Sequence, residues 1–178
     1  MNTGAWLTKA AVWLALLAYA IGAGMMLRAQ GRARWLVHAR RMWTAGCVFF
    51  LAHVVFAFGF YHGWSHDVAY RQTARQTAEM TGFRWGGGLF LNYLFALAWL
   101  GDVLWWWLAP GSFARRARWL TRIWHGFFFF MVLNGAIVFG SGPVRWFGAA
   151  ICSILGVLWW RSRATARMAN IAAHTPMQ

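Results

Sequence analysis

Five long apolar runs, separated by clusters of arginine, constrain this chain more than any other feature of its sequence. The runs cover about residues 6–27, 42–61, 85–109, 123–140 and 144–160. Crossing a hydrocarbon core of roughly 30 Å takes about 20 helical residues, and only a helix or a closed barrel satisfies every backbone group there. The runs lack strand-type alternation. The sequence therefore predicts an all-α bundle of five transmembrane helices.

Composition supports a single integral membrane domain over residues 1–178. The chain is 61% hydrophobic and only 11% charged, which is too apolar for a soluble domain of this length. Its net charge of +14 would suit nucleic acid, but the arginines lie between apolar runs and not on one soluble face. We therefore expect the lipid bilayer, and not nucleic acid, as the partner.

The distribution of basic residues predicts the orientation, because cytoplasmic loops carry the excess of Lys and Arg. One side receives twelve arginines, which are Arg28, Arg32, Arg34, Arg40, Arg41, Arg115, Arg116, Arg118, Arg122, Arg161, Arg163 and Arg167. The other side carries Lys9, Arg71, Arg75, Arg84 and Arg145, together with Asp67 and Glu79. This asymmetry predicts a bacterial inner (cytoplasmic) membrane protein with its N-terminus outside and its C-terminus in the cytoplasm.

Tryptophan supplies a second estimate of the boundaries, because the indole prefers the headgroup zone. The outer boundary is indicated by Trp6, Trp64, Trp85 and Trp146. The inner boundary is indicated by Trp35, Trp43, Trp105, Trp106, Trp107, Trp119, Trp124, Trp159 and Trp160. Only two of the fifteen tryptophans, Trp13 and Trp99, fall within the predicted membrane core.

The longest outer connection, residues 62–84, predicts a short amphipathic surface helix over 68–81. Ser65 is a suitable N-cap for it, and Gly82 is a suitable stop. Three consecutive glycines follow at 86–88. They predict a very close backbone approach at the outer end of the third transmembrane helix.

Three polar residues of different apolar runs share one estimated depth, roughly 10 Å below the outer surface at about 1.5 Å per helical residue. They are His53, Asn92 and Asn134. One interpretation is a cofactor site, with His53 as a ligand of haem b or of a metal ion and Met131 as an opposite ligand. The alternative is a layer of hydrogen bonds that joins helices.

His62 and His66 lie four residues apart above this layer, with Asp67 adjacent. On a continuous helix both imidazoles would share a face, as a two-histidine metal site requires, and the carboxylate would bind or orient. Together with His53 they form our predicted metal-ligand set for copper, iron or zinc. The alternative is that Gly63 breaks the helix and that these are ordinary interfacial histidines.

Asp102 and His125 form a second polar pair, near the inner surface. Asp102 is the only acidic residue within a predicted span, so we expect it to be protonated or paired, with His125 or Arg122 as the partner. A structural salt bridge and a proton entry point are the two interpretations of this inner pair.

These observations predict a small redox or metal/haem-binding membrane subunit with a histidine site near the outer leaflet. Two other functions stay open. One is a structural or assembly subunit of a larger membrane complex, with membrane protein partners or further copies of the chain. The other is a proton or small-solute conductor. Nucleotide-binding and hydrolase motifs are absent, and a chain with three carboxylates has little material for carboxylate catalysis.

Overall fold

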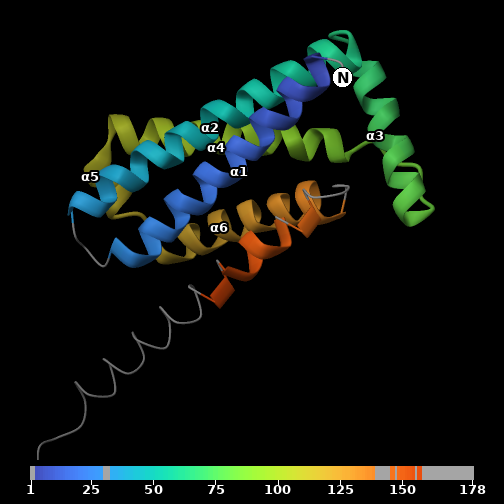
Figure 1. The fold of residues 1–178 in the computed structure, drawn as a ribbon. Helices are drawn as coiled ribbons and strands as arrows, with labels where there is room; N and C mark the ends of the chain where they lie inside the picture. The colour runs from blue at the N-terminus through green and yellow to red at the C-terminus, as the bar shows by residue number, and fades with distance from the viewer. Residues whose placement is uncertain (1–2, 30–32, 139–144, 147, 155, 158–178) are drawn as a thin grey trace, which may run out of the picture.

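The computed structural model describes residues 3–29, 33–138, 145–146, 148–154 and 156–157, and in this part of the chain all regular structure is helical (Figure 1). The elements are α1 (Thr3–Ala29), α2 (Ala33–His62), α3 (His66–Thr81), α4 (Gly88–Leu108), α5 (Pro110–Ala114), α6 (Arg118–Val132) and the π-helix η1 (Leu133–Val138). The predicted all-α class is confirmed for these residues.

Within the described residues, three helices are long and apolar enough to cross a membrane, namely Thr3–Arg28, Arg34–His62 and Gly88–Leu108. They coincide with the first three predicted spans. The fourth predicted span, 123–140, coincides with α6 and η1, but α6 has only 15 residues before the helix changes to π geometry. The fifth, 144–160, lies partly outside the described residues. The count of five spans therefore stays a prediction.

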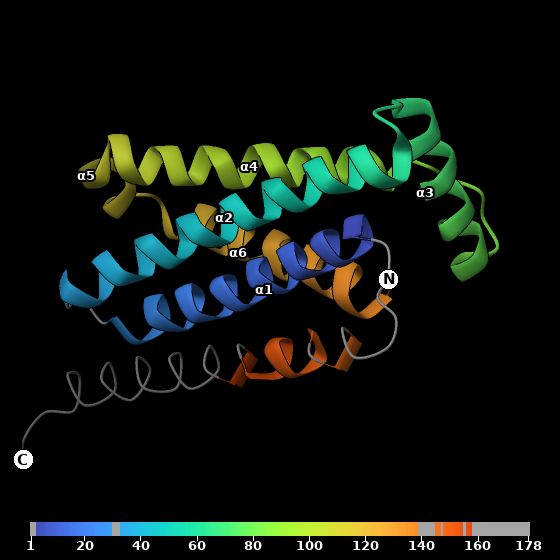
Figure 2. The ribbon, with the colours of Figure 1, turned by 45° about the horizontal axis from the view of Figure 1, so that its top comes forward.

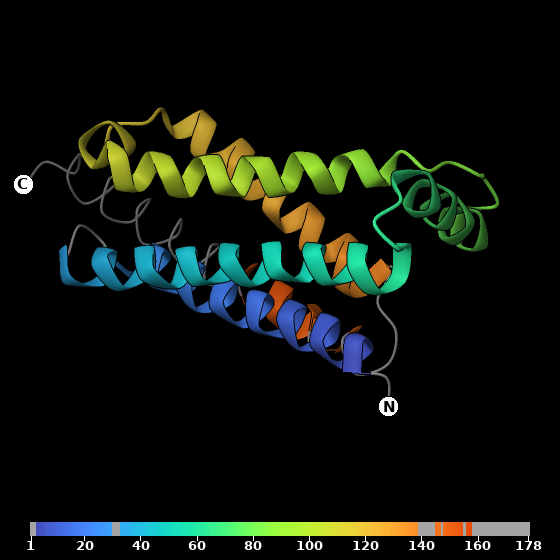
Figure 3. The same ribbon diagram turned by 90° about the horizontal axis from the view of Figure 1, so that it is seen from above.

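Successive long helices run in alternating directions. The start of α1 lies at the same end of the bundle as α3, and α5 lies at the opposite end (Figures 2 and 3). This arrangement agrees with the predicted placement of the N-terminus and the 62–84 connection on one side. Because only three residues join α1 to α2, these two helices are antiparallel neighbours, whereas α2 and α4 are joined by the longer segment that contains α3.

The tightest packing joins α1 and α2, where small residues let the two backbones approach. A Cβ atom at Gly22 would lie 3.2 Å from the backbone nitrogen of Trp43, and Ala39 beside it is 0% exposed. Gly46 of α2 lies equally close to α1, since a Cβ there would lie 3.3 Å from the backbone nitrogen of Tyr19. Such contacts are typical of helices packed within a membrane, where small residues allow close approach.

The helix α2 begins nine residues before its predicted start at Met42, so that Arg34, Arg40 and Arg41 lie on helix and not in a loop. Hydropathy marks where the lipid-exposed stretch begins, whereas backbone hydrogen bonds continue into the headgroup zone. At about 1.5 Å per residue, a helix of 30 residues is longer than a hydrocarbon core is thick. The length of α2 is therefore sufficient for its first turns to extend beyond an apolar layer of that thickness.

The surface helix α3 forms as predicted and lies at an angle to the end of the bundle (Figure 1). The Ser65 hydroxyl accepts the Val68 N–H at 3.3 Å, and Gly82 ends the helix in the left-handed region at φ 76°. The close approach expected of the three glycines also occurs. A Cβ atom at Gly86 would lie 2.6 Å from the carbonyl oxygen of Tyr70.

Candidate functional site

Asp102 of α4 is the centre of a buried polar cluster at the end of the bundle where α5 lies. It is only 3% exposed, yet both carboxylate oxygens accept hydrogen bonds. The Trp43 indole N–H of α2 donates to Oδ2 at 2.9 Å, and the Arg116 guanidinium donates to Oδ1 at 2.9 Å. The two donors come from different elements, so the carboxylate joins α2, α4 and the turn before α6. A buried charge held in this way costs far less than an isolated one.

The short helix α5 brings Arg116 back toward Asp102. Pro110 occupies its first turn, where a missing N–H carries no penalty. Phe113 then stacks on Trp106 with ring centroids 4.5 Å apart, and the Arg116 guanidinium lies 4.1 Å above the Phe113 ring. Burial lowers the pKa of Arg116 and the Asp102 carboxylate raises it, while arginine keeps its charge at neutral pH.

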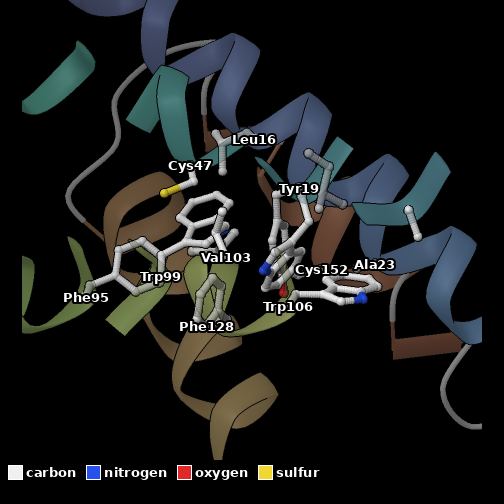
Figure 4. Packing of buried hydrophobic residues seen from close by; sticks show 14 of the residues in the cluster. Leu16, Tyr19, Ala23, Cys47, Phe95, Trp99, Val103, Trp106, Phe128 and Cys152 are labelled. Carbon is white, nitrogen blue, oxygen red and sulfur yellow. The ribbon is translucent and has the colours of Figure 1, made fainter. Parts of the chain in front are cut away.

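Aromatic rings fill the bundle beside this cluster. Trp43 is 0% exposed and lies 4.9 Å from Phe128 of α6 and 5.5 Å from Trp99 of α4, measured between ring centroids. Tyr19 of α1 completes the group at 5.6 Å from Trp43. Figure 4 shows Tyr19, Trp99 and Phe128 converging from three helices. The Trp43 ring packs against other helices in the protein interior and is not exposed to the surroundings of the bundle.

Asp102 is paired in the structure, but its partners differ from those we expected. Asp102 accepts hydrogen bonds from Arg116 and Trp43, whereas we expected His125 or Arg122 as its partner. His125 lies next to the cluster with its ring 5.9 Å from that of Trp43, and Arg122 is exposed. Sequence reasoning assigned Arg116 to the cytoplasmic loop and Trp43 to the headgroup zone. Trp43 and Asp102 were both expected near the inner surface, and this similar depth was the one sequence signal that the two side chains meet.

A second contact joins the same ends of α2 and α4. The Arg40 guanidinium lies 4.0 Å above the Trp107 ring, and the Trp107 indole N–H donates to the Thr44 hydroxyl at 2.9 Å. Arg40 also donates to the carbonyl oxygen of Trp106 at 3.5 Å. Cation–π and hydrogen-bond contacts at this end therefore position α4 on α2.

His53, the first residue of the predicted outer site, joins α2 to α1. Its Nδ1 lies 3.0 Å from the Thr8 carbonyl oxygen. A carbonyl can only accept, so Nδ1 carries the proton and a neutral ring keeps its lone pair on Nε2. Thr8 itself is buried, and its hydroxyl donates to the Gly4 carbonyl at 2.8 Å.

The other members of the predicted outer layer point elsewhere. Asn134 lies in η1, and its amide donates to the Phe130 carbonyl of its own helix at 2.9 Å. Asn92 is exposed on α4. Met131 packs against the apolar core. Equal depth thus did not produce a shared hydrogen-bonded layer, because depth does not specify the rotation of each helix about its axis.

The helix breaks between His62 and His66, as the alternative interpretation of Gly63 proposed. Gly63 and Trp64 both have positive φ values, 54° and 60°, so His62 ends α2 and His66 begins α3. His66 Nδ1 lies 3.0 Å from the Tyr93 hydroxyl, and the ring of His62 packs against Phe58 with its Nδ1 buried and without a hydrogen-bond partner among the described residues.

Asp67, the predicted carboxylate ligand, is directed toward its own helix. It forms an ion pair with Arg71 one turn later at 2.6 Å, and both side chains are exposed. Within the ranges that the structure describes, no three His, Cys, Asp or Glu residues are grouped so that they could hold a metal ion.

Over the residues that the structure describes, the fold is all-helical, with membrane-like helices and a tryptophan-rich aromatic interior. Comparisons with protein-family models, with curated proteins and with solved structures gave no match. What the chain does must therefore be argued from its own contacts.

Proposed function

We propose that the protein is a structural subunit of a larger membrane protein assembly, and that its intramembrane polar groups hold its own helices together. One observation carries this proposal. His53, Asp102 and His125 each contact another helix, through the Thr8 carbonyl in one case and through Trp43 in the other two. Polar side chains used in this way act as interhelical glue.

The packed interior supports the same function. Where the helices meet, the space is filled by Tyr19, Trp43, Trp99 and Phe128, whose neighbouring ring centroids lie 4.9–6.1 Å apart. A haem between these helices would need that space, and a path for protons or solutes through Asp102 and His125 would have to pass these rings. The conductor hypothesis therefore has less support than a structural role.

An exposed apolar stripe on α4 offers a surface for the assembly. Its large members are 47–81% exposed and recur at helical spacing, namely Phe90, Leu94, Leu97, Leu104 and Leu108. Gly101 lies within the stripe, and a Cβ atom there would meet nothing within 4 Å. A glycine inside a helix weakens it unless a close neighbour uses the space, and small residues are enriched where membrane helices meet.

Extraction in a mild detergent tests the proposal. Native sizing and crosslinking should return the 20.3 kDa chain in a particle with other polypeptides or further copies. Gly101→Leu should release the chain as a monomer without lowering its thermal stability, because the added side chain meets open space. Val55→Leu, at another exposed position, is the matched control and should stay assembled. A wild-type chain that is monomeric under every extraction condition contradicts the proposal.

A cofactor-binding function remains a second candidate because of His53. Imidazoles that bind metals usually donate their other N–H to a carbonyl or carboxylate, which directs the free lone pair at the metal, and His53 donates Nδ1–H to Thr8. Metal analysis and an absorption spectrum of purified protein test this function. A Soret band or stoichiometric copper, iron or zinc that disappears in His53→Ala would support it, and their absence from the wild-type protein would remove it.

A further inference from the structure

A polar hollow lies outside the bundle, between α3 and the segment that leads to α4. Its volume is about 1060 Å³. It is lined by Val68, Arg71, Gln72, Arg75, Gln76, Ala78, Glu79 and Arg84, and we call it the α3 groove. The first seven residues recur along one side of α3, and Arg84 approaches from the following segment. Neither the helix-joining clusters nor the α4 stripe includes any of them.

Positive charge dominates the α3 groove. Three arginines line it against one carboxylate, Glu79, and Asp67 beside it forms an exposed ion pair with Arg71 at 2.6 Å, so the net charge is +1 when both carboxylates are included. Arg75 meets Glu79 only at 4.0 Å, and the arginine side chain in this pair is 80% exposed. Exposed pairs of this kind are weak. The three guanidiniums therefore remain able to bind an anion, and arginine's planar array of donors matches phosphate oxygens.

The residues around Arg84 place the α3 groove at a membrane surface. Phe83 and Trp85 flank it in sequence and are 67% and 49% exposed, and Met80 on the preceding turn is 49% exposed. Aromatic side chains prefer the zone between headgroups and acyl chains. A segment that presents arginine between two exposed aromatic rings would bring the guanidinium to the level of lipid phosphates, with the rings directed at the acyl chains.

We propose that the α3 groove binds the headgroup of an anionic phospholipid in the leaflet next to α3. Arg71, Arg75 and Arg84 hold the phosphate, and the Gln72 and Gln76 amides supply hydrogen bonds to the headgroup. The site would anchor α3 on the membrane surface. It is independent of the proposed assembly role, because its residues lie outside the α4 stripe.

Native mass spectrometry of the detergent-purified full chain, titrated with phosphatidylglycerol, tests this site. Each arginine near an anionic lipid surface contributes about fivefold in affinity. A variant with Arg71→Gln, Arg75→Gln and Arg84→Gln should therefore bind the lipid at least about tenfold more weakly. The matched control, Arg34→Gln, Arg41→Gln and Arg122→Gln, removes the same charge from exposed positions elsewhere and should keep the affinity of this one site.

A second groove variant and a second lipid complete the test. Gln76→Glu adds a negative charge to the groove while all three arginines remain, and it should also weaken binding, so the inference does not depend on the triple variant folding. Phosphatidylcholine should bind much more weakly than phosphatidylglycerol. Equal affinity for the two lipids, unchanged binding in both groove variants, or displacement of the lipid by millimolar inorganic phosphate would each overturn the proposal, the last by assigning the groove to a soluble anion.

Discussion

Asp102 and Trp43 show how a carboxylate is accommodated among membrane helices. The Trp43 ring fills space in the interior, and its indole N–H donates a hydrogen bond to the Asp102 carboxylate at 2.9 Å. Trp99, its neighbour at 5.5 Å, is similarly buried, but among the described residues its indole N–H has no partner. The two tryptophans are thus buried in the same aromatic interior, but only the indole N–H of Trp43 forms a hydrogen bond among the described residues.

Trp43→Phe should therefore destabilise the protein more than Trp99→Phe does. Both changes remove the same atoms, but only the first removes a donor from a buried carboxylate, while the second removes an unsatisfied group. We expect a difference of about 1 kcal/mol or more in the free energy of unfolding, measured by detergent or thermal unfolding followed by circular dichroism. Equal losses of unfolding free energy in the two variants would mean that Trp43 stabilises the protein only through the volume of its ring.

The Asp102–Arg116 ion pair makes a second prediction, because its side chains are only 3% and 10% exposed. Removing one partner of a buried pair costs up to about 3–5 kcal/mol, since the other charge stays buried without compensation. Asp102→Asn and Arg116→Gln should each destabilise the protein, and the double variant should lose less than their sum. A coupling of about 1–3 kcal/mol is expected from the double-mutant cycle.

The exposed pair Asp67 and Arg71 is the control for that cycle. The Asp67 side chain is 67% exposed and the Arg71 side chain 62%, and both lie on one helix. Exposed pairs contribute about 0.2–1 kcal/mol, so its cycle should give a clearly smaller coupling. Similar couplings in the two cycles would show that burial does not strengthen the Asp102–Arg116 contact.

Individual helices differ in how they use glycine. Gly46 in α2 faces packed neighbours, because a Cβ there would lie 2.8 Å from a ring carbon of Trp99. Gly101 in α4 faces open space. The first glycine is required by the protomer's own packing, whereas the second leaves room that the protomer does not use.

Alanine at these two positions should therefore have opposite effects on the isolated chain in detergent. Gly46→Ala should cost about 1–3 kcal/mol through overpacking. Gly101→Ala should stabilise the helix by about 0.5–1 kcal/mol, because alanine loses less backbone entropy than glycine. Unfolding midpoints of the two variants measure this directly. Destabilisation by both would indicate that Gly101 already has a neighbour in the isolated chain.

The elements themselves were largely predictable. Three long helices and the capped surface helix α3 follow from apolar length, from Ser65 and from Gly82, all of which act locally. The short helix α5 was missed, although Pro110 is a typical first-turn residue. The early start of α2 was missed because hydropathy reports the lipid boundary and not the end of backbone hydrogen bonding.

For the molecule as a whole, the two ends of the bundle should lie on opposite sides of the membrane. Met80 in α3 and Ala114 in α5 are exposed, and these two helices lie at opposite ends of the bundle (Figure 2). In intact cells, Met80→Cys should react with a membrane-impermeant maleimide, and Ala114→Cys should react only after the membrane is opened, because arginine is retained on the cytoplasmic side.

The wild-type chain provides the blank for this labelling, since Cys47 and Cys152 are 2% and 8% exposed. The reverse pattern would show that the orientation is inverted. Labelling of both positions from one side would show that the bundle does not separate its two ends across the bilayer.

The amino-acid sequence was sufficient to derive the fold class, the long helices and the likeness of these helices to membrane spans. Whether a segment is long and apolar enough to cross a membrane depends on that segment alone and not on its neighbours. The partners of Asp102 and His53 could not be derived. Which side chains meet depends on how each helix is rotated and where it crosses its neighbours, and this is decided by many packing contacts at once. For that reason Arg116 and Trp43, and not His125, bind Asp102, and His53 and Asn134, which share one predicted depth, form separate contacts.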